Sequence, residues 1–141
     1  MSDHQGDYRE APEGVVAERT ALADHVCREL ARAGLPASRE DRDDQVGALV
    51  EVDTGDDAAG GVFVDWKPDP ALTGAAMEQM QKGEYRAPVI EHNGAVRAHM
   101  QKAIIGILRS AGFQADAAAD FDGDLRPLSV RVEPGGPTTR H

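Results

Sequence analysis

Residues 94–113, GAVRAHMQKAIIGILRSAGF, form the stretch of this 141-residue chain that is apolar enough and long enough to start a hydrophobic core. Wound as an α-helix, the stretch gathers its apolar side chains on one broad face, with the spacing of a helix that packs on a core. These side chains are Val96, Met100, Ala103, Ile104, Ile107, Leu108 and Ala111. Gly112 predicts the end of the helix, because glycine accepts the left-handed conformation that commonly follows a last turn.

Ile105 lies away from the centre of that apolar face, between Lys102 and Arg109. Single exposed apolar side chains are common on protein surfaces, so this isoleucine is either an ordinary surface residue or covered by a second layer. A further interpretation is that Ile105 contacts another protein or a second copy of the chain.

A second helix is predicted from Val15 to Ala33, where apolar side chains recur at helical spacing before Gly34 and Pro36 stop the pattern. Arg19 falls within the apolar face, and we interpret it as a first-turn arginine that extends past the end of the core. Cys27 lies on the same face and is expected to be an inert core thiol rather than a nucleophile.

Residues 48–53 (ALVEVD) and 61–67 (GVFVDWK) are rich in branched and aromatic side chains and flank the turn sequence TGDDAAG, so they predict a β-hairpin. In the second strand, Val62, Val64 and Trp66 share one face, while Phe63 shares the other with an aspartate. Trp66 is expected in the core or at its edge, because large aromatic side chains are mostly buried.

Three further signals complete the order of elements. Asp69 followed by Pro70 starts a short helix that stops near Gly83, and residues 84–93 are predicted to connect it to the long helix. Residues 113–119 alternate weakly and residues 128–132 clearly, as strands do. Residues 36–39 are a candidate for a short edge strand.

This order, roughly α-β(β)-β-α-α-β-β, predicts an α+β fold. We expect a two-layer sandwich, in which an antiparallel sheet of four to five strands carries two long helices and one short helix on one face. Residues 15–133 are predicted to form this single domain, between a disordered acidic N-terminus at 1–14 and a disordered tail at 134–141. The order is similar to that of the small α+β chaperones of bacterial secretion systems, which bind partner proteins as homodimers. The resemblance rests on element order and assigns no residue a role.

The charge balance narrows the classes of partner. With 25 acidic and 15 basic residues, the chain has a net charge of −10, which opposes binding to nucleic acid and to anionic membranes. One cysteine, no signal-peptide pattern and no long apolar run lead us to expect a cytoplasmic protein. Twelve arginines against three lysines, with abundant alanine and glycine, are typical of a GC-rich bacterial genome.

Two turns carry clustered aspartates and are weak candidates for calcium. One cluster is Asp120, Asp122 and Asp124, and the other is Asp53, Asp56 and Asp57. An EF-hand is excluded at the first cluster, because Leu125 stands where the loop needs glycine and Arg131 where it needs glutamate. We interpret both clusters as solvated turns and expect no cofactor.

His92 and His99 are seven residues apart, which is about 10 Å along a helix axis and too far for both to bind one metal ion directly. The chain also has no H-E-x-x-H, C-x-x-C, G-x-S-x-G or phosphate-binding glycine motif. We therefore expect a non-catalytic protein-interaction module, an adaptor or chaperone-like protein that binds a protein partner or forms a homodimer. Its candidate contact residues are Ile105, Phe63 and Trp66.

The alternative hypothesis is a small ligand-binding protein or enzyme. It would use a cleft between the long helix and the sheet, lined by Trp66, His92 and His99. A pocket that brings these three side chains together would favour this alternative.

Overall fold

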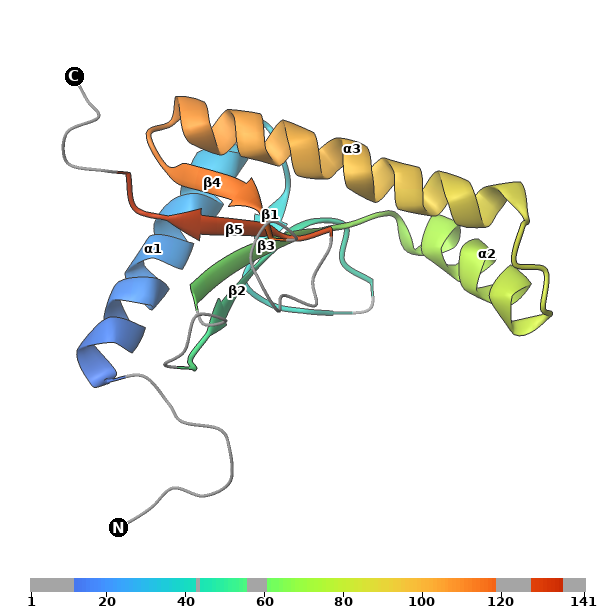
Figure 1. Cartoon of the computed structure of the whole chain (residues 1–141), viewed down its shortest axis with the longest axis horizontal. Helices are drawn as coiled ribbons and strands as arrows, with labels where there is room; N and C mark the ends of the chain where they lie inside the picture. The colour runs from blue at the N-terminus through green and yellow to red at the C-terminus, as the bar shows by residue number, and fades with distance from the viewer. Residues whose placement is uncertain (1–11, 43, 56–60, 119–127, 136–141) are drawn as a thin grey trace, which may run out of the picture.

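The computed structural model describes residues 12–42, 44–55, 61–118 and 128–135. Along the chain the elements are α1 (Glu13–Arg32), β1 (Ala37–Ser38), β2 (Gly47–Asp53), β3 (Gly61–Lys67), α2 (Pro70–Gln81), α3 (Pro88–Ser110), β4 (Gln114–Ala117) and β5 (Val130–Glu133). Within these residues, three helices and one five-stranded sheet form the α+β fold that the sequence predicted (Figure 1).

The strands lie in the order β1-β2-β3-β5-β4. Neighbouring strands are antiparallel except β1 and β2, which are parallel, so the sheet is mixed rather than purely antiparallel. The connection between β1 and β2 returns the chain to the end from which β1 started, and β2 therefore runs in the same direction. The short edge strand considered at residues 36–39 is present as β1, and the Ala48 amide donates to the Pro36 carbonyl at 2.8 Å beside it.

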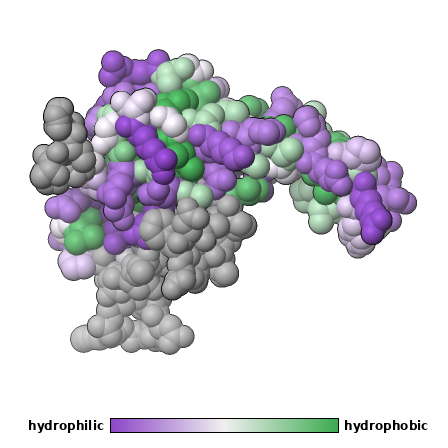
Figure 2. Space-filling view, turned by 45° about the horizontal axis from the view of Figure 1, so that its top comes forward, coloured by the Kyte–Doolittle hydropathy of each residue, from purple (hydrophilic) through white to green (hydrophobic). Residues whose placement is uncertain are grey.

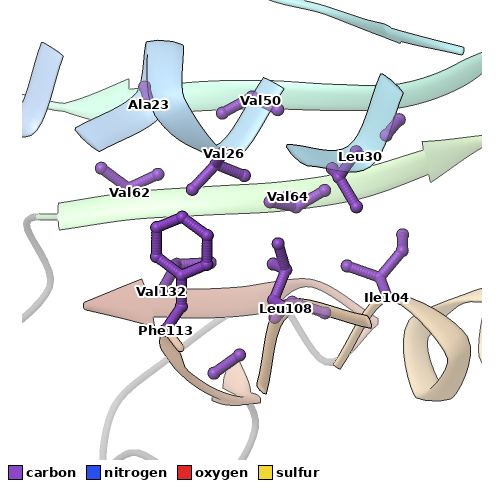
Figure 3. Close-up of a cluster of buried hydrophobic side chains, with 13 residues drawn as sticks. Ala23, Val26, Leu30, Val50, Val62, Val64, Ile104, Leu108, Phe113 and Val132 are labelled. Carbon is purple, nitrogen blue, oxygen red and sulfur yellow. The ribbon is translucent and has the colours of Figure 1, made fainter. Parts of the chain in front are cut away.

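The core lies between one face of the sheet and the two long helices. Helix α1 packs over β1, β2 and β3, while α3 packs over β3, β4 and β5. Period-two alternation along the strands turns their valines toward the helices. Figure 3 shows these valines facing α1 and α3. The buried cluster consists of Ala23, Val26, Leu30, Ala48, Val50, Val62, Val64, Ile104, Leu108, Phe113, Ala115, Val130 and Val132.

Both long helices end where the sequence predicted. Gly34 and Gly112 have φ of +101° and +102°, the positive range that glycine enters without strain. Phe113 follows Gly112 into the core, where it is 8% exposed and its ring meets the His25 ring edge-on with centroids 4.8 Å apart. The start of α3 differs from the prediction: it lies at Pro88, because proline fits the first helical turn, so the predicted connection at 84–93 is shorter.

The short helix occupies a different place from the two long ones. Helix α2 packs mainly on the first half of α3, and both extend beyond the strands (Figure 1). We call residues 70–99 the arm, and the remainder of the structure the body. Among the described residues, no helix is long and apolar enough to cross a bilayer.

Helix α1 begins at Glu13, slightly before the predicted start at Val15. The disorder predicted for the two ends of the chain falls mostly on residues 1–11 and 136–141, which lie outside the described residues.

Candidate functional site

The arm leaves the body through a short and well-defined connection. Strand β3 ends at Lys67, Pro68 is buried, and α2 begins at Pro70. The Asp69 carboxylate accepts a hydrogen bond from the Ala71 amide at 2.8 Å, which is the helix cap that the sequence predicted. Because so few residues join the strand to the helix, the sheet fixes the position of the base of the arm.

The arm has almost no core of its own. Of residues 70–99, only Ala76 is buried. Several larger apolar side chains of the arm are only half-buried: Leu72, Val89, Ile90 and Val96. Two packed helices have one shared side each, so they cannot enclose the apolar residues on their other sides. The arm therefore keeps apolar surface in contact with water.

The most exposed apolar side chains of the described chain are also concentrated here. Met77, Met80 and Tyr85 are 54%, 49% and 67% exposed, and Val46, at 39%, is the one such side chain in the body. Figure 2 shows the arm standing out from the body, with hydrophobic and hydrophilic residues intermixed on its surface. The arm contains three acidic and three basic residues, so the whole net charge of −10 lies outside it.

A cavity of about 660 Å³ lies at the base of the arm. The body contributes Leu49, Glu51, Asp65, Trp66, Lys67 and Pro68, with Asp41 and Gln45 from the segment before β2. The arm contributes Pro70, Thr73, Gly74, Met77, Asn93 and Arg97. The strand residues Leu49, Glu51 and Asp65 alternate with core residues, so they line the cavity from the sheet face opposite the two long helices, whereas Trp66 lies on the core face near the end of β3.

Several polar groups of the cavity wall are already paired. Lys67 Nζ lies 2.5 Å from Asp41 Oδ1 and donates to the Arg42 carbonyl at 2.8 Å. Asp65 Oδ1 accepts a hydrogen bond from the Ser129 hydroxyl. In the arm, the Thr73 hydroxyl donates to Asn93 Oδ1 at 3.3 Å, which links α2 to α3.

Two donors in the wall are not paired within the described chain. Arg97, which is half-buried, has no hydrogen-bond or salt-bridge partner there. Gln45 is 8% exposed; its Oε1 accepts from the Arg42 amide at 3.3 Å, whereas its buried Nε2 has no partner among the described residues. An unpaired buried donor is costly, so the wall favours a ligand that brings acceptor atoms.

The residues predicted for a ligand cleft separate in the structure. Trp66 is half-buried, packs against the core and lines the cavity. His92 and His99 are both exposed on α3 and are not part of the cavity wall. Of the predicted contact residues besides Trp66, Phe63 is 1% exposed and Ile105 is half-buried against the core. The exposed apolar surface thus lies elsewhere, on the arm.

Of the aspartates in the two predicted clusters, only Asp53 lies within the described residues. Asp120, Asp122, Asp124, Asp56 and Asp57 lie outside the described residues. The Asp53 carboxylate accepts from the Gly55 amide at 2.9 Å, a contact of the kind that aspartate makes in turns. In the part of the chain that the structure describes, no three histidine, cysteine or acidic side chains are grouped to hold a metal ion.

The contacts of Cys27 and Arg19 indicate structural roles rather than chemical ones. Burial raises the pKa of the Cys27 thiol, an effect that the nearby Arg39 charge partly offsets and the Asp24 charge reinforces. A raised pKa reduces the thiolate form, which is the reactive one.

Arg19 Nη1 donates to the Asp53 and Gly55 carbonyls at 2.8 and 2.7 Å, so the guanidinium holds α1 to the end of β2.

Arginine side chains also donate hydrogen bonds to backbone carbonyl groups near both edges of the sheet. Beyond the short β1, Arg39 Nε donates to the Val50 carbonyl at 3.2 Å. At the other edge, Arg109 Nε donates to the Ala115 carbonyl of β4 at 2.8 Å, and its Nη2 lies 2.6 Å from Asp116 Oδ1. A strand added at an edge needs free backbone groups, so these contacts disfavour that mode of association.

Sequence reasoning did not identify Arg97, Asp65 or Gln45 as members of a site. A signal was present for Arg97, which lies one helical turn after Asn93 and so shares a polar side of α3 with it. Gln45 comes near the arm only through the fold, and its distance along the sequence from Arg97 and Asp65 gives no signal of this kind.

Comparison with known proteins gives no relative for this chain. It matches no protein-family model, no curated protein and no solved structure. The arm and the cavity are thus the features from which a function can be inferred.

Proposed function

We propose that this chain is a protein-interaction module that forms a homodimer through its arm. The observation that carries the proposal is the arm itself, which projects from the body with only Ala76 buried among residues 70–99. A two-helix projection of this kind gains stability when another surface covers its apolar sides.

A second copy of the arm is the partner of suitable shape. Two arms packed around a two-fold axis would form a four-helix bundle, the arrangement in which short helices commonly build a shared core. Met80 and Tyr85, near the tip, would become buried together with the half-buried Val89 and Ile90. The same patch on both copies would meet itself, as a two-fold interface requires.

The distribution of charge favours the same surface. The net charge of −10 lies in the residues outside the arm, and these repel one another between two copies, whereas the arm, with three acidic and three basic residues, carries no net charge. Pairing through the arm tips brings the copies together while keeping the acidic bodies apart.

The alternative of pairing by strand addition is less favoured. Arg39 and Arg109 already donate to backbone carbonyls near the two edges of the sheet. A dimer built through the arm leaves these contacts intact. It would also display two copies of the body, as an adaptor or chaperone-like protein does when it binds its partner proteins.

The double variant Met80→Gln with Tyr85→Gln tests the proposal. Both side chains are about half exposed or more in the single chain, so their replacement should leave the fold of one copy unchanged. Truncation of well-packed interface anchors commonly costs about 2 kcal/mol or more, so we expect the dimer dissociation constant to rise at least about tenfold. Sedimentation equilibrium measures it directly.

The matched control is Val46→Gln, which removes an exposed apolar side chain from the body. This variant should associate like the parent chain. Equal dissociation constants for the double variant and the parent chain would contradict a dimer through the arm.

A further inference from the structure

We propose that the cavity at the base of the arm binds a small zwitterion of the amino-acid class, either a free amino acid or a short peptide with both termini free and an apolar side chain. Its carboxylate would meet Arg97 and its ammonium group would meet Asp65. The inference does not depend on the homodimer, because neither residue belongs to the proposed arm contact.

The charges of the cavity wall lead to this class of ligand. Of the two cations, Lys67 is neutralised by Asp41 at 2.5 Å, which leaves Arg97 without a partner among the described residues. Of the acidic side chains, Glu51 takes part in an interaction of its own, and Asp65 receives a hydrogen bond from the uncharged Ser129 hydroxyl. Arg97 is therefore a cation, and Asp65 an anion, that no ion pair within the described chain neutralises.

These two charges come from different elements and do not pair with each other. Arg97 belongs to α3 in the arm, whereas Asp65 belongs to β3 in the body, and no salt bridge within 4.0 Å joins them. A molecule that carries a carboxylate and an ammonium group can satisfy both at once. Arginine suits this role because its planar guanidinium binds carboxylates through two parallel hydrogen bonds.

The remaining wall fits the rest of such a ligand. Leu49 and Met77 provide apolar surface for a side chain, and Trp66 borders the cavity from the core face of β3. The buried Gln45 Nε2, unpartnered within the described chain, offers a donor for a carbonyl oxygen. The cavity volume of about 660 Å³ falls within the range of small-ligand sites, about 300–1,000 Å³, and has room for a short peptide.

The balance of charge argues against simpler ligands. The wall has three acidic residues, Asp41, Glu51 and Asp65, and two basic ones, Lys67 and Arg97. A purely anionic ligand would enter against this acidic excess, and a purely cationic one would leave Arg97 unpaired. A zwitterion adds no net charge and pairs with both signs.

Tryptophan fluorescence provides the test, because Trp66 is the single tryptophan and lines the cavity. The probe is the dipeptide leucyl-phenylalanine, titrated beside its N-acetyl form, which lacks the ammonium group, and its C-terminal amide, which lacks the carboxylate. We expect a saturable change with the free dipeptide and at least about tenfold weaker binding of each blocked form. Titration with free phenylalanine then distinguishes an amino acid from a peptide as the source of the zwitterion.

Three variants test which residue binds which charged group of the ligand. Arg97→Gln should abolish the preference for the free carboxylate over the amide, and Arg97→Lys should restore part of it. Asp65→Asn should abolish the preference for the free amine over the acetyl form. His99→Gln, which changes an exposed residue of the same helix outside the cavity, should bind like the parent chain.

The variants also separate binding from folding. Arg97 has no side-chain partner among the described residues, so its replacement should leave the melting temperature unchanged. If none of the probes gives a saturable change at millimolar concentrations, or if the blocked forms bind as tightly as the free dipeptide, the proposal is wrong. That outcome would leave the homodimer standing, since the mass of the protein is measured independently.

Discussion

At the scale of single residues, Gly47 fixes the junction between β1 and β2. Its φ is +116°, and a Cβ atom built there would lie 2.6 Å from the Pro36 carbonyl oxygen. Gly47→Ala should therefore lower the free energy of unfolding by about 2 kcal/mol or more, through backbone strain and the clash with Pro36. Urea denaturation of the purified variant measures the change.

Gly106→Ala is the matched control. Gly106 lies on the exposed side of α3, where an added Cβ would meet nothing within 4 Å. Alanine favours helix over glycine by about 0.5–1 kcal/mol, so this variant should be more stable than the parent chain. Similar effects of the two substitutions would contradict the close approach at Gly47.

The contribution of Cys27 to the free energy of unfolding should depend on pH in a defined direction. Burial raises the pKa of its thiol in the folded chain, although the positive charge of Arg39 acts in the opposite direction. Folding therefore favours the neutral thiol. This contribution to stability is fully present below the pKa of the unfolded chain, and it is lost as the pH rises through the raised folded-state value. Cys27→Ala should therefore lose less stability than the parent chain in alkaline solution. Urea midpoints measured across that pH range would reveal it, and parallel pH profiles for the two proteins would contradict it.

At the scale of elements, the arm and the body differ in how much they bury. The second half of α3 places Ile104 and Leu108 in the core, whereas α2 buries only Ala76. Regions with few buried contacts open locally at low cost. Amides of α2 should exchange with deuterium much faster than those around Leu108 in dilute solution, and more slowly once the concentration is high enough for dimers. Exchange of α2 as slow as that of the core at every dilution would contradict this account.

Local signals in the sequence were sufficient to predict most of the helices and strands. The glycines at 34 and 112 end the two long helices and Asp69 caps α2, because each effect acts over a few neighbouring residues. The two strands predicted as a hairpin pair with each other as β2 and β3. The apolar face of residues 94–113 correctly placed Ile104 and Leu108 in the core.

The arm and the cavity could not be predicted in this way. Helical periodicity shows which side of α3 is apolar, but not which element covers it. The sheet covers Ile104 in the second half of the helix, whereas α2 packs against the first half, where Val96 is only half-buried. The cavity joins Gln45, Asp65 and Arg97 from three separate segments, so their proximity follows from tertiary packing alone. His92 and His99 are both exposed on α3 and lie outside the wall of this cavity.

At the scale of the whole molecule, the acidic excess and the apolar surface lie in different places. The net charge of −10 lies outside the arm, arginine contacts lie near both sheet edges of the body, and the arm holds most of the exposed large apolar side chains of the described chain. In the proposed homodimer, this division would keep the acidic parts of the two copies apart while the arms join them. Raising the salt concentration should tighten association modestly, because it screens the repulsion between the bodies.

The solution mass of the full chain, measured by size-exclusion chromatography with light scattering over a wide range of concentration, tests the central claim most directly. One copy has a mass of 15.0 kDa. A homodimer through the arm predicts twice that mass at high concentration, falling toward a single copy on dilution. A mass of one copy at every concentration would contradict the account, because the apolar side chains of the arm would then remain exposed with no second arm to cover them.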